Sequence, residues 1–161
     1  MHRRTPPFKA LIGLCLAAGL LSGPAQADNH ACPDLKTAVQ VAACPTEAEL
    51  KYTYMGFCGD NARLYGRDVL TCSTFENYKE AKNIAMWESA DGKFSGYLSC
   101  NVPAEQIHAS KPLRMSSDSK NGLTRLVCDY ENDHRMVYRS KQACKVAVAD
   151  CSTGDCTAEC E

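Results

Sequence analysis

The apolar positions in the N-terminal part of the chain repeat with the spacing of α-helices. After Pro33 they fall at i, i+3, i+4 and i+7, which predicts a short helix that ends at Cys44-Pro45. Thr46 then precedes the acidic turn Glu47-Ala48-Glu49, which favours a second helix ending at Gly56 or Gly59. The segment 52–57 fits an extended strand equally well, so both alternatives stay open. Residues 61–67 are predicted to be a connection.

A third helix is predicted from residue 73 to the turn Asp91-Gly92. Ser73 lies three residues before Glu76, the spacing of a capping box at a helix start. Tyr78 and Ala85 belong to an apolar stripe along the predicted inner side of this helix, while lysines and Glu80 occupy the other side.

From residue 93 onward, apolar and polar residues alternate instead, which indicates β-strands. The pair Asn121-Gly122 is a strong hairpin signal. The predicted elements are a strand at 93–102, a helical turn at 104–108, strands beginning at 113 and spanning 123–130 and 135–140, and a strand or helix at 142–149.

This order of elements predicts an α+β fold. The N-terminal helices would pack on one face of an antiparallel meander of three to four strands, because no alternating βαβ pattern is present. Residues 28–150 are predicted to form one domain, and residues 151–161 a polar tail held by cysteines.

The first 27 residues have the pattern of an export signal. Arg3, Arg4 and Lys9 surround the start of an apolar run that is too short to span a bilayer, and Ala25-Gln26-Ala27 offers a cleavage site before Asp28. The sequence therefore predicts a signal peptide at 1–27, a periplasmic or secreted product, and no transmembrane segment after its removal.

The net charge of the chain after removal of the signal argues against nucleic acid as a partner. Loss of three basic residues with the signal leaves 15 basic against 19 acidic residues, a net charge of −4. Nucleic acid, which binds proteins largely through phosphate contacts with lysine and arginine, is therefore not expected as a partner.

The cysteine count predicts a disulfide framework. In an oxidising compartment, the even number of cysteines left after the signal would form five disulfides, whose pairing cannot be read from the sequence. A thiolate metal site at Cys151, Cys156 and Cys160 is the alternative. The cysteines concerned are Cys32, Cys44, Cys58, Cys72, Cys100, Cys128, Cys144, Cys151, Cys156 and Cys160.

The strong local signatures of catalysis are absent from the sequence. It has no GxSxG, HExxH, phosphate-loop or GxGxxG motif, and an even cysteine count leaves no free thiol nucleophile. We therefore predict no catalytic residues and a non-enzymatic protein. A small hydrolase of unknown substrate, dependent on His108 or His134, remains an alternative.

A metal site follows if cleavage occurs after Ala27. The mature chain would then begin Asp28-Asn29-His30, and a histidine in third position can bind Cu(II) in a square plane with the terminal amine and two backbone amides. No other cofactor is expected, and copper binding through His30 is one alternative function.

Aromatic residues offer a binding surface for a partner protein. Tyr52 and Tyr54 lie in one cluster, and Trp87 and Tyr97 flank the turn at Asp91-Gly92. Large aromatic side chains on a rigid scaffold are effective anchors at protein interfaces. The residues Arg135, Arg139, Lys141 and Lys145 also form a basic strip at the end of the meander, suited to an acidic partner.

Cys44-Pro45, Trp87, Leu98-Ser99-Cys100 and Cys128-Asp129-Tyr130 resemble the cysteine-proline start and cysteine-x-tyrosine strand of small bacterial exported proteins. This resemblance implies an envelope protein and carries over no functional residue. In size and compartment the chain is also similar to periplasmic immunity and inhibitor proteins. The expected function is thus an exported, non-enzymatic protein-binding module, possible roles being an inhibitor or immunity factor of the bacterial envelope.

Overall fold

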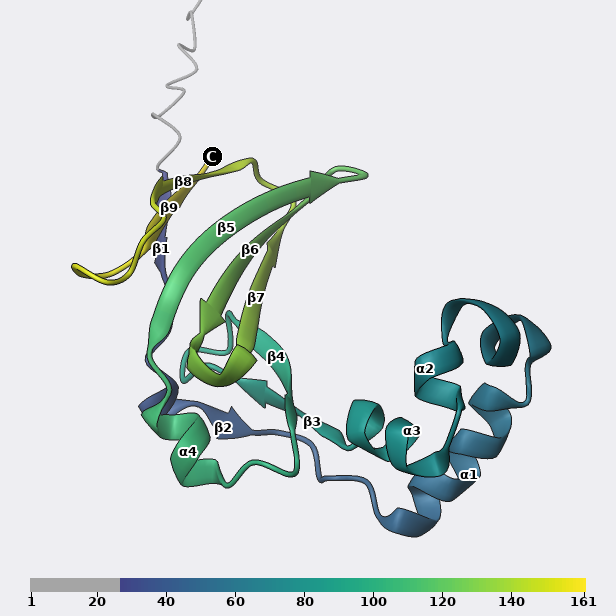
Figure 1. Cartoon of the computed structure of the whole chain (residues 1–161). Helices are drawn as coiled ribbons and strands as arrows, with labels where there is room; N and C mark the ends of the chain where they lie inside the picture. The colour runs from purple at the N-terminus through teal and green to yellow at the C-terminus, as the bar shows by residue number, and fades with distance from the viewer. Residues whose placement is uncertain (1–26) are drawn as a thin grey trace, which may run out of the picture.

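The computed structural model describes residues 27–161, so the signal-peptide prediction lies almost entirely outside the described residues. The chain folds into short helices and antiparallel strands (Figure 1). The helical elements are η1 (Leu35–Thr37), α1 (Glu47–Cys58), η2 (Arg63–Arg67), α2 (Val69–Cys72), α3 (Phe75–Lys82), α4 (Ala104–Ala109) and η3 (Glu131–Asp133). The strands are β1 (Asp28–Ala31), β2 (Val39–Gln40), β3 (Ile84–Glu88), β4 (Ser95–Ser99), β5 (Pro112–Lys120), β6 (Leu123–Tyr130), β7 (Arg135–Ser140), β8 (Cys144–Val148) and β9 (Thr157–Cys160).

Two antiparallel sheets organise the fold. One has six strands in the order β2-β3-β4-β7-β6-β5, and the other has three in the order β1-β9-β8. The α+β class is thereby confirmed, but the sheets are larger than the predicted meander of three to four strands. Within the described residues, no helix is long and apolar enough to cross a membrane.

The predicted helix at 33–43 is wrong. Only a single 3-10 turn forms, at η1, and Ala38 already has extended backbone angles. β2 follows and pairs with β3, and the amide of Val41 donates a further hydrogen bond to the carbonyl of Met86. Pairing with a strand far away in the sequence thus outweighs the local helical pattern.

The predicted third helix is right in its first half only. It is α3, and its cap is Thr74, whose side chain accepts from the Asn77 amide, so the capping box predicted at Ser73 is wrong by one residue. The helix ends at Lys82 instead of Asp91. The segment that follows is β3, in which Ala85 and Trp87 are buried. Residues two apart share one side of a strand, so apolar positions 85 and 87 fit the strand better than a helix.

The elements after residue 103 agree closely with their predictions. β6 and β7 have the expected bounds, and α4 forms the expected helical turn. Asn121 and Gly122 both adopt positive φ in the hairpin between β5 and β6, as an asparagine-glycine turn requires. The segment 142–149, open between strand and helix, is the strand β8.

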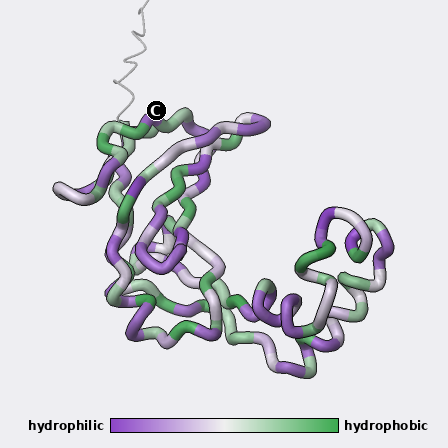
Figure 2. The backbone as a smooth tube through the Cα atoms, viewed as in Figure 1, coloured by the Kyte–Doolittle hydropathy of each residue, from purple (hydrophilic) through white to green (hydrophobic). Residues whose placement is uncertain are grey.

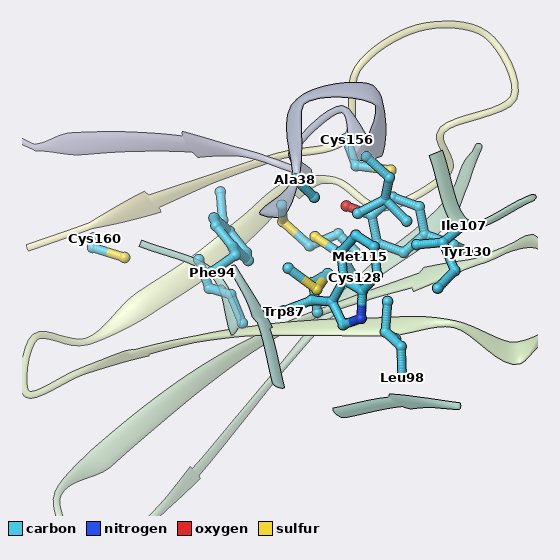
Figure 3. Close-up of a cluster of buried hydrophobic side chains, with 14 residues drawn as sticks. Ala38, Trp87, Phe94, Leu98, Ile107, Met115, Cys128, Tyr130, Cys156 and Cys160 are labelled. Atoms are coloured by element: carbon cyan, nitrogen blue, oxygen red, sulfur yellow. The ribbon is translucent and has the colours of Figure 1, made fainter. Parts of the chain in front are cut away.

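The main hydrophobic core lies between the six-stranded sheet and the elements that cover one of its faces. Its buried side chains come from η1, α4 and both sheets. Figure 3 shows Trp87 within this cluster, close to Met115 and Cys128. The interior strands β6 and β7 contribute Leu126, Cys128 and Met136, each fully buried.

A helical arm, residues 44–83, interrupts the hairpin between β2 and β3 and extends away from the sheets (Figure 1). The prediction that these helices pack on one face of the sheet is therefore wrong, because they bury their apolar residues against one another. α1 begins with a reciprocal capping box between Thr46 and Glu49. The arm has its own small buried cluster of Leu50, Cys58, Cys72 and Tyr78. Hydrophobic segments therefore occur both in the sheets and in the arm (Figure 2).

All ten cysteines outside the first 26 residues form disulfides, which confirms the predicted framework. Cys58–Cys72 lies within the arm, and Cys44–Cys100 fastens its base to the end of β4. The pairs are Cys32–Cys128, Cys44–Cys100, Cys58–Cys72, Cys144–Cys160 and Cys151–Cys156. In the segment predicted as a tail, residues 157–160 form β9, the middle strand of the smaller sheet.

Candidate functional site

One face of the six-stranded sheet lies opposite the core, and no described helix contributes to a core on that side. Because side chains alternate along strands, burial of Trp87, Leu98 and Met136 directs their neighbours to this other face. We call it the open face. Residues on this face include Met86, Glu88, Ser95, Tyr97, Arg114, Asp118, Lys120, Arg125, Val127, Asp129, Arg135, Val137 and Arg139.

The open face is hollowed where β3, β4 and β7 meet. This hollow has a volume of about 360 Å³ and is lined by Met86, Ser95, Gly96, Tyr97, Arg135, Val137 and Arg139. Tyr97 is 67% exposed, and Met86 is its cross-strand neighbour. An exposed tyrosine, two arginines and an apolar floor are the side-chain types that dominate binding energy at protein interfaces.

Two aspartates orient most of the arginines on this face. Asp129 accepts from Arg135 Nε at 2.7 Å and from Arg114 Nη2 at 3.2 Å, and Asp118 accepts two hydrogen bonds from Arg125. Burial acts to raise the pKa of Asp129, but the hydrogen bonds from the two arginines outweigh it and hold that pKa below its usual value. Arg139 has no ion pair with any described residue.

A second, wider hollow of about 580 Å³ adjoins the first and shares Arg135 with it. Its lining includes Arg114, Asp129, Asp133 and His134. Equal numbers of arginines and aspartates line this hollow, so it has little net charge to attract an ion.

The arm presents a different kind of surface. Leu50, Tyr54 and Phe57 of α1 pack towards the arm's own core. Tyr52 and Met55, three residues apart on the other side of the same helix, are 76% and 68% exposed. Beyond α1, the exposed large apolar residues of the arm are Tyr65, Val69 and Leu70. Helix α1 is therefore apolar on two sides, and only one of them is covered.

The aromatic residues predicted to bind a partner do not lie together. Tyr52 is on the exposed side of α1, and Tyr97 is on the open face. Tyr54 packs against Phe75 and Tyr78 and donates a hydrogen bond to the Cys72 carbonyl. Trp87 is 5% exposed, so in this conformation it belongs to the core and does not reach a partner.

The basic strip is also divided by the fold. Arg135 and Arg139 of β7 share the open face, whereas Lys145 lies on β8 in the other sheet. The union of these two arginines with Tyr97 and Met86 was missed by the sequence analysis. The alternation of residues along β4 separates Tyr97 from the buried Leu98 and so predicts that Tyr97 faces away from the core. The pairing of β4 with β7, which brings the arginines close, has no local signal in the sequence.

His30, the residue predicted to bind copper, is buried in β1. It pairs with Ala158 of β9, its ring lies 4.2 Å from that of Tyr138, and its Nε2 has no hydrogen-bond partner among the described residues. A square-planar chelate at Asp28-Asn29-His30 would need this segment to leave the sheet. Copper binding stays a prediction.

His134 and Ser110 form a buried pair. The Ser110 hydroxyl donates to the Glu131 carbonyl at 2.8 Å, so His134 Nδ1, at 3.1 Å, donates to Ser110. A general base must instead accept the serine proton. His108 contacts the Ala38 carbonyl through Nε2, at 3.2 Å. These contacts are structural hydrogen bonds of the two histidines. The hydrolase alternative stays a prediction.

The two buried histidines predict a dependence of stability on pH. Burial lowers the pKa of both His30 and His134 below the ordinary value of 6.5, with Lys93 adding to the effect at His30. Their contribution to stability is complete above pH 6.5, and it is lost as the pH falls towards the folded-state pKa values, because the unfolded chain binds protons first.

We expect the free energy of unfolding to decrease between pH 7.5 and pH 5, measured by urea denaturation in buffers of equal ionic strength. The variant His30→Gln/His134→Gln should show a flatter profile over this range. An equally steep profile in this variant would assign the decrease to other groups. The carboxyl groups with lowered pKa values, such as Asp118 and Asp129, titrate below this range.

Three sulfur atoms gather where β1 meets the C-terminal segment. Sγ of Cys32, Cys151 and Cys156 all lie within 4.8 Å of one another. Each is bonded in a disulfide, and disulfide sulfur does not provide the thiolate that zinc needs. Cys160, the third residue of the alternative metal site, pairs with Cys144.

The described residues thus include two candidate binding surfaces, the exposed side of α1 and the hollow of the open face. Comparison with known proteins adds no relative to these observations: no family model matches the chain, and no curated protein or solved structure is significantly similar to it.

Proposed function

We propose that the chain is an exported, non-enzymatic protein that binds another protein, and that the arm makes the principal contact. An inhibitor or immunity factor of the bacterial envelope is the role that fits this proposal. Five disulfides fit an extracellular or otherwise oxidising compartment. The cleaved signal and the periplasmic or secreted location belong to the proposal.

The observation that carries the proposal is the apolar side of α1 that nothing covers. A surface helix normally keeps its apolar residues on one side, towards the core. Here Tyr52 and Met55 are exposed although Leu50 and Tyr54 already supply the covered side. Large exposed apolar side chains that gather in one segment are typical of interaction sites.

The arm is also held in a defined shape, which favours binding. Cys58–Cys72 joins the end of α1 to α2, and Cys44–Cys100 fixes the base of the arm to the sheet. The guanidinium of Arg63 lies 4.0 Å from the ring centre of Phe57, and Arg63 also pairs with Asp68 at 3.2 Å. A surface that is ordered before binding loses less conformational entropy when it binds.

The test compares the chain from Asp28 onward with the variant Tyr52→Ser/Met55→Ser. Each protein is immobilised and exposed to envelope extract, and the retained protein is purified and titrated against both. We expect the variant to bind at least tenfold more weakly, about 1.4 kcal/mol, because removal of a central aromatic anchor costs at least this much.

The matched control is Val148→Ser, which changes an exposed apolar residue of β8 outside the arm. It should bind as the unchanged chain does. Equal binding by the arm variant and the unchanged chain would contradict the role of the arm, and retention of no protein by any of the three would contradict the proposed function.

A further inference from the structure

The open face is positively charged in a chain that is otherwise acidic. Its charged residues are Arg114, Lys120, Arg125, Arg135 and Arg139 against Glu88, Asp118 and Asp129, whereas residues 28–161 together have a net charge of −4. Both aspartates already bind arginines of this face. Arg139, on β7 at the border of the hollow, is the arginine of this face that has no such partner among the described residues.

Arg135 and Arg139 are both able to bind a further anion. Arg139 has no ion pair with a described residue, and Arg135 uses only Nε in its hydrogen bond to Asp129. Since both line the hollow, each can offer its terminal nitrogens to a carboxylate there. They lie four residues apart on one side of a strand, about 13 Å at 3.3 Å per residue.

The floor between the two arginines is apolar. Val137 lies midway between them on β7, and Met86 and Tyr97 line the same hollow from β3 and β4. An extended peptide places alternate side chains on one side, so residues 1 and 5 would reach the arginines while residue 3 contacts Val137 and Tyr97.

We propose that this hollow binds an acidic, extended segment of a partner protein, with carboxylates four residues apart and an apolar side chain midway between them. The inference rests on the proposed function, because both take the ligand to be a protein. It differs in assigning a charge pattern to the partner and in placing the contact on the sheet.

The observations favour a protein segment over an anionic polymer or membrane. The open face has five basic residues against three acidic ones, a small excess for binding to a densely charged surface. Sulfate or phosphate groups alone would bind the arginines and leave the apolar floor of the hollow without a contact. An aspartate or glutamate next to a leucine or phenylalanine uses both features.

The experiment is an NMR titration of the isotopically labelled chain from Asp28 onward. The probe is a pentapeptide, capped at both ends, with glutamate at positions 1 and 5, phenylalanine at 3 and serine at 2 and 4. We expect saturable shifts of backbone amides in β4 and β7. A probe with glutamine in place of both glutamates should bind at least tenfold more weakly.

Two variants locate the site. Arg139→Gln should weaken binding of the acidic probe at least tenfold, and it breaks no ion pair among the described residues. The matched control Arg67→Gln removes an exposed arginine of the arm that also has no ion pair there, and it should bind the probe as the unchanged chain does. Tyr52→Ser/Met55→Ser should bind the probe normally.

These outcomes separate the two proposals. Failure of the acidic probe to bind, or binding that Arg139→Gln leaves unchanged, overturns the inference even if the arm retains a partner. Normal probe binding without any retained partner overturns the proposed function instead. Stronger binding of a sulfated polysaccharide or of anionic vesicles at Arg139 than of the probe would also overturn the inference.

Discussion

Replacing both Cys32 and Cys128 by alanine is expected to lower the free energy of unfolding by about 4 kcal/mol, the chain-entropy value for a loop of roughly 40 residues. The two cysteines are 96 residues apart, but the intact Cys44–Cys100 disulfide spans 56 of these residues, so the loop that their bond closes in the unfolded chain is shortened accordingly. The bond also joins the three-stranded sheet, at the end of β1, to the interior strand β6. Urea denaturation, with the other four disulfides confirmed by mass spectrometry, measures the change.

The comparison variant is Cys151→Ala/Cys156→Ala. This disulfide closes a loop of only five residues, for which the same relation gives about 2 kcal/mol. Both double variants remove a complete pair and leave no unpaired thiol. A loss for Cys32–Cys128 that is no larger than the loss for Cys151–Cys156 would contradict the argument from loop length.

Gly96→Ala is expected to destabilise the protein by about 2–3 kcal/mol, in the upper part of the range for overpacked positions. A Cβ atom at this position would collide with the carbonyl oxygen of Arg135 and would press on Met136 Sδ. The contact lies where β4 meets β7, and a single register pair, Ser95 with Val137, joins these strands. The sheet has to open there to admit the methyl group.

Thermal and urea unfolding of Gly96→Ala and Gly56→Ala would check this expectation. Gly56 lies inside α1 with no atom within 4 Å of an added Cβ, so alanine there should be neutral or stabilising by up to about 1 kcal/mol. If both variants lost the same stability, close approach at Gly96 would not be the cause.

The parts of the fold that were predicted correctly depend on local signals. Asn121-Gly122 specifies its own turn, and the strands on both sides of residues 131–134 alternate clearly enough to give their bounds. Thr46 and the acidic turn after it likewise mark the start of α1 by local sequence alone. Each of these signals can act before the rest of the chain is in place.

The predictions that failed concern segments whose partners are distant. The helical spacing after Pro33 is real, but residues 39–41 pair with β3, which lies beyond the whole arm. Pairing with other strands likewise makes residues 84–88 a strand instead of the continued helix that the local pattern predicts. A local pattern cannot reveal which of two structures a distant strand will stabilise.

The candidate sites were predictable to different degrees. Tyr52 and Tyr97 were named from their residue type, and both are exposed. Trp87 has the same aromatic character, but its position next to Ala85 and Leu98 on the core side could not be known without the pairing of β3 and β4. The hollow with Arg135 and Arg139 depends on one further long-range pairing, between β4 and β7.

The arrangement of the smaller sheet determines how late in the synthesis of the chain this sheet can form. Among the strands that the structure describes, β1 pairs only with β9, in a register that sets Asp28 opposite Cys160. The ribosome makes the described residues of β1 first and those of β9 last. The first strand must therefore wait, with His30 uncovered, until nearly all the described sequence has emerged, and the complete sheet can form only after translation of that sequence.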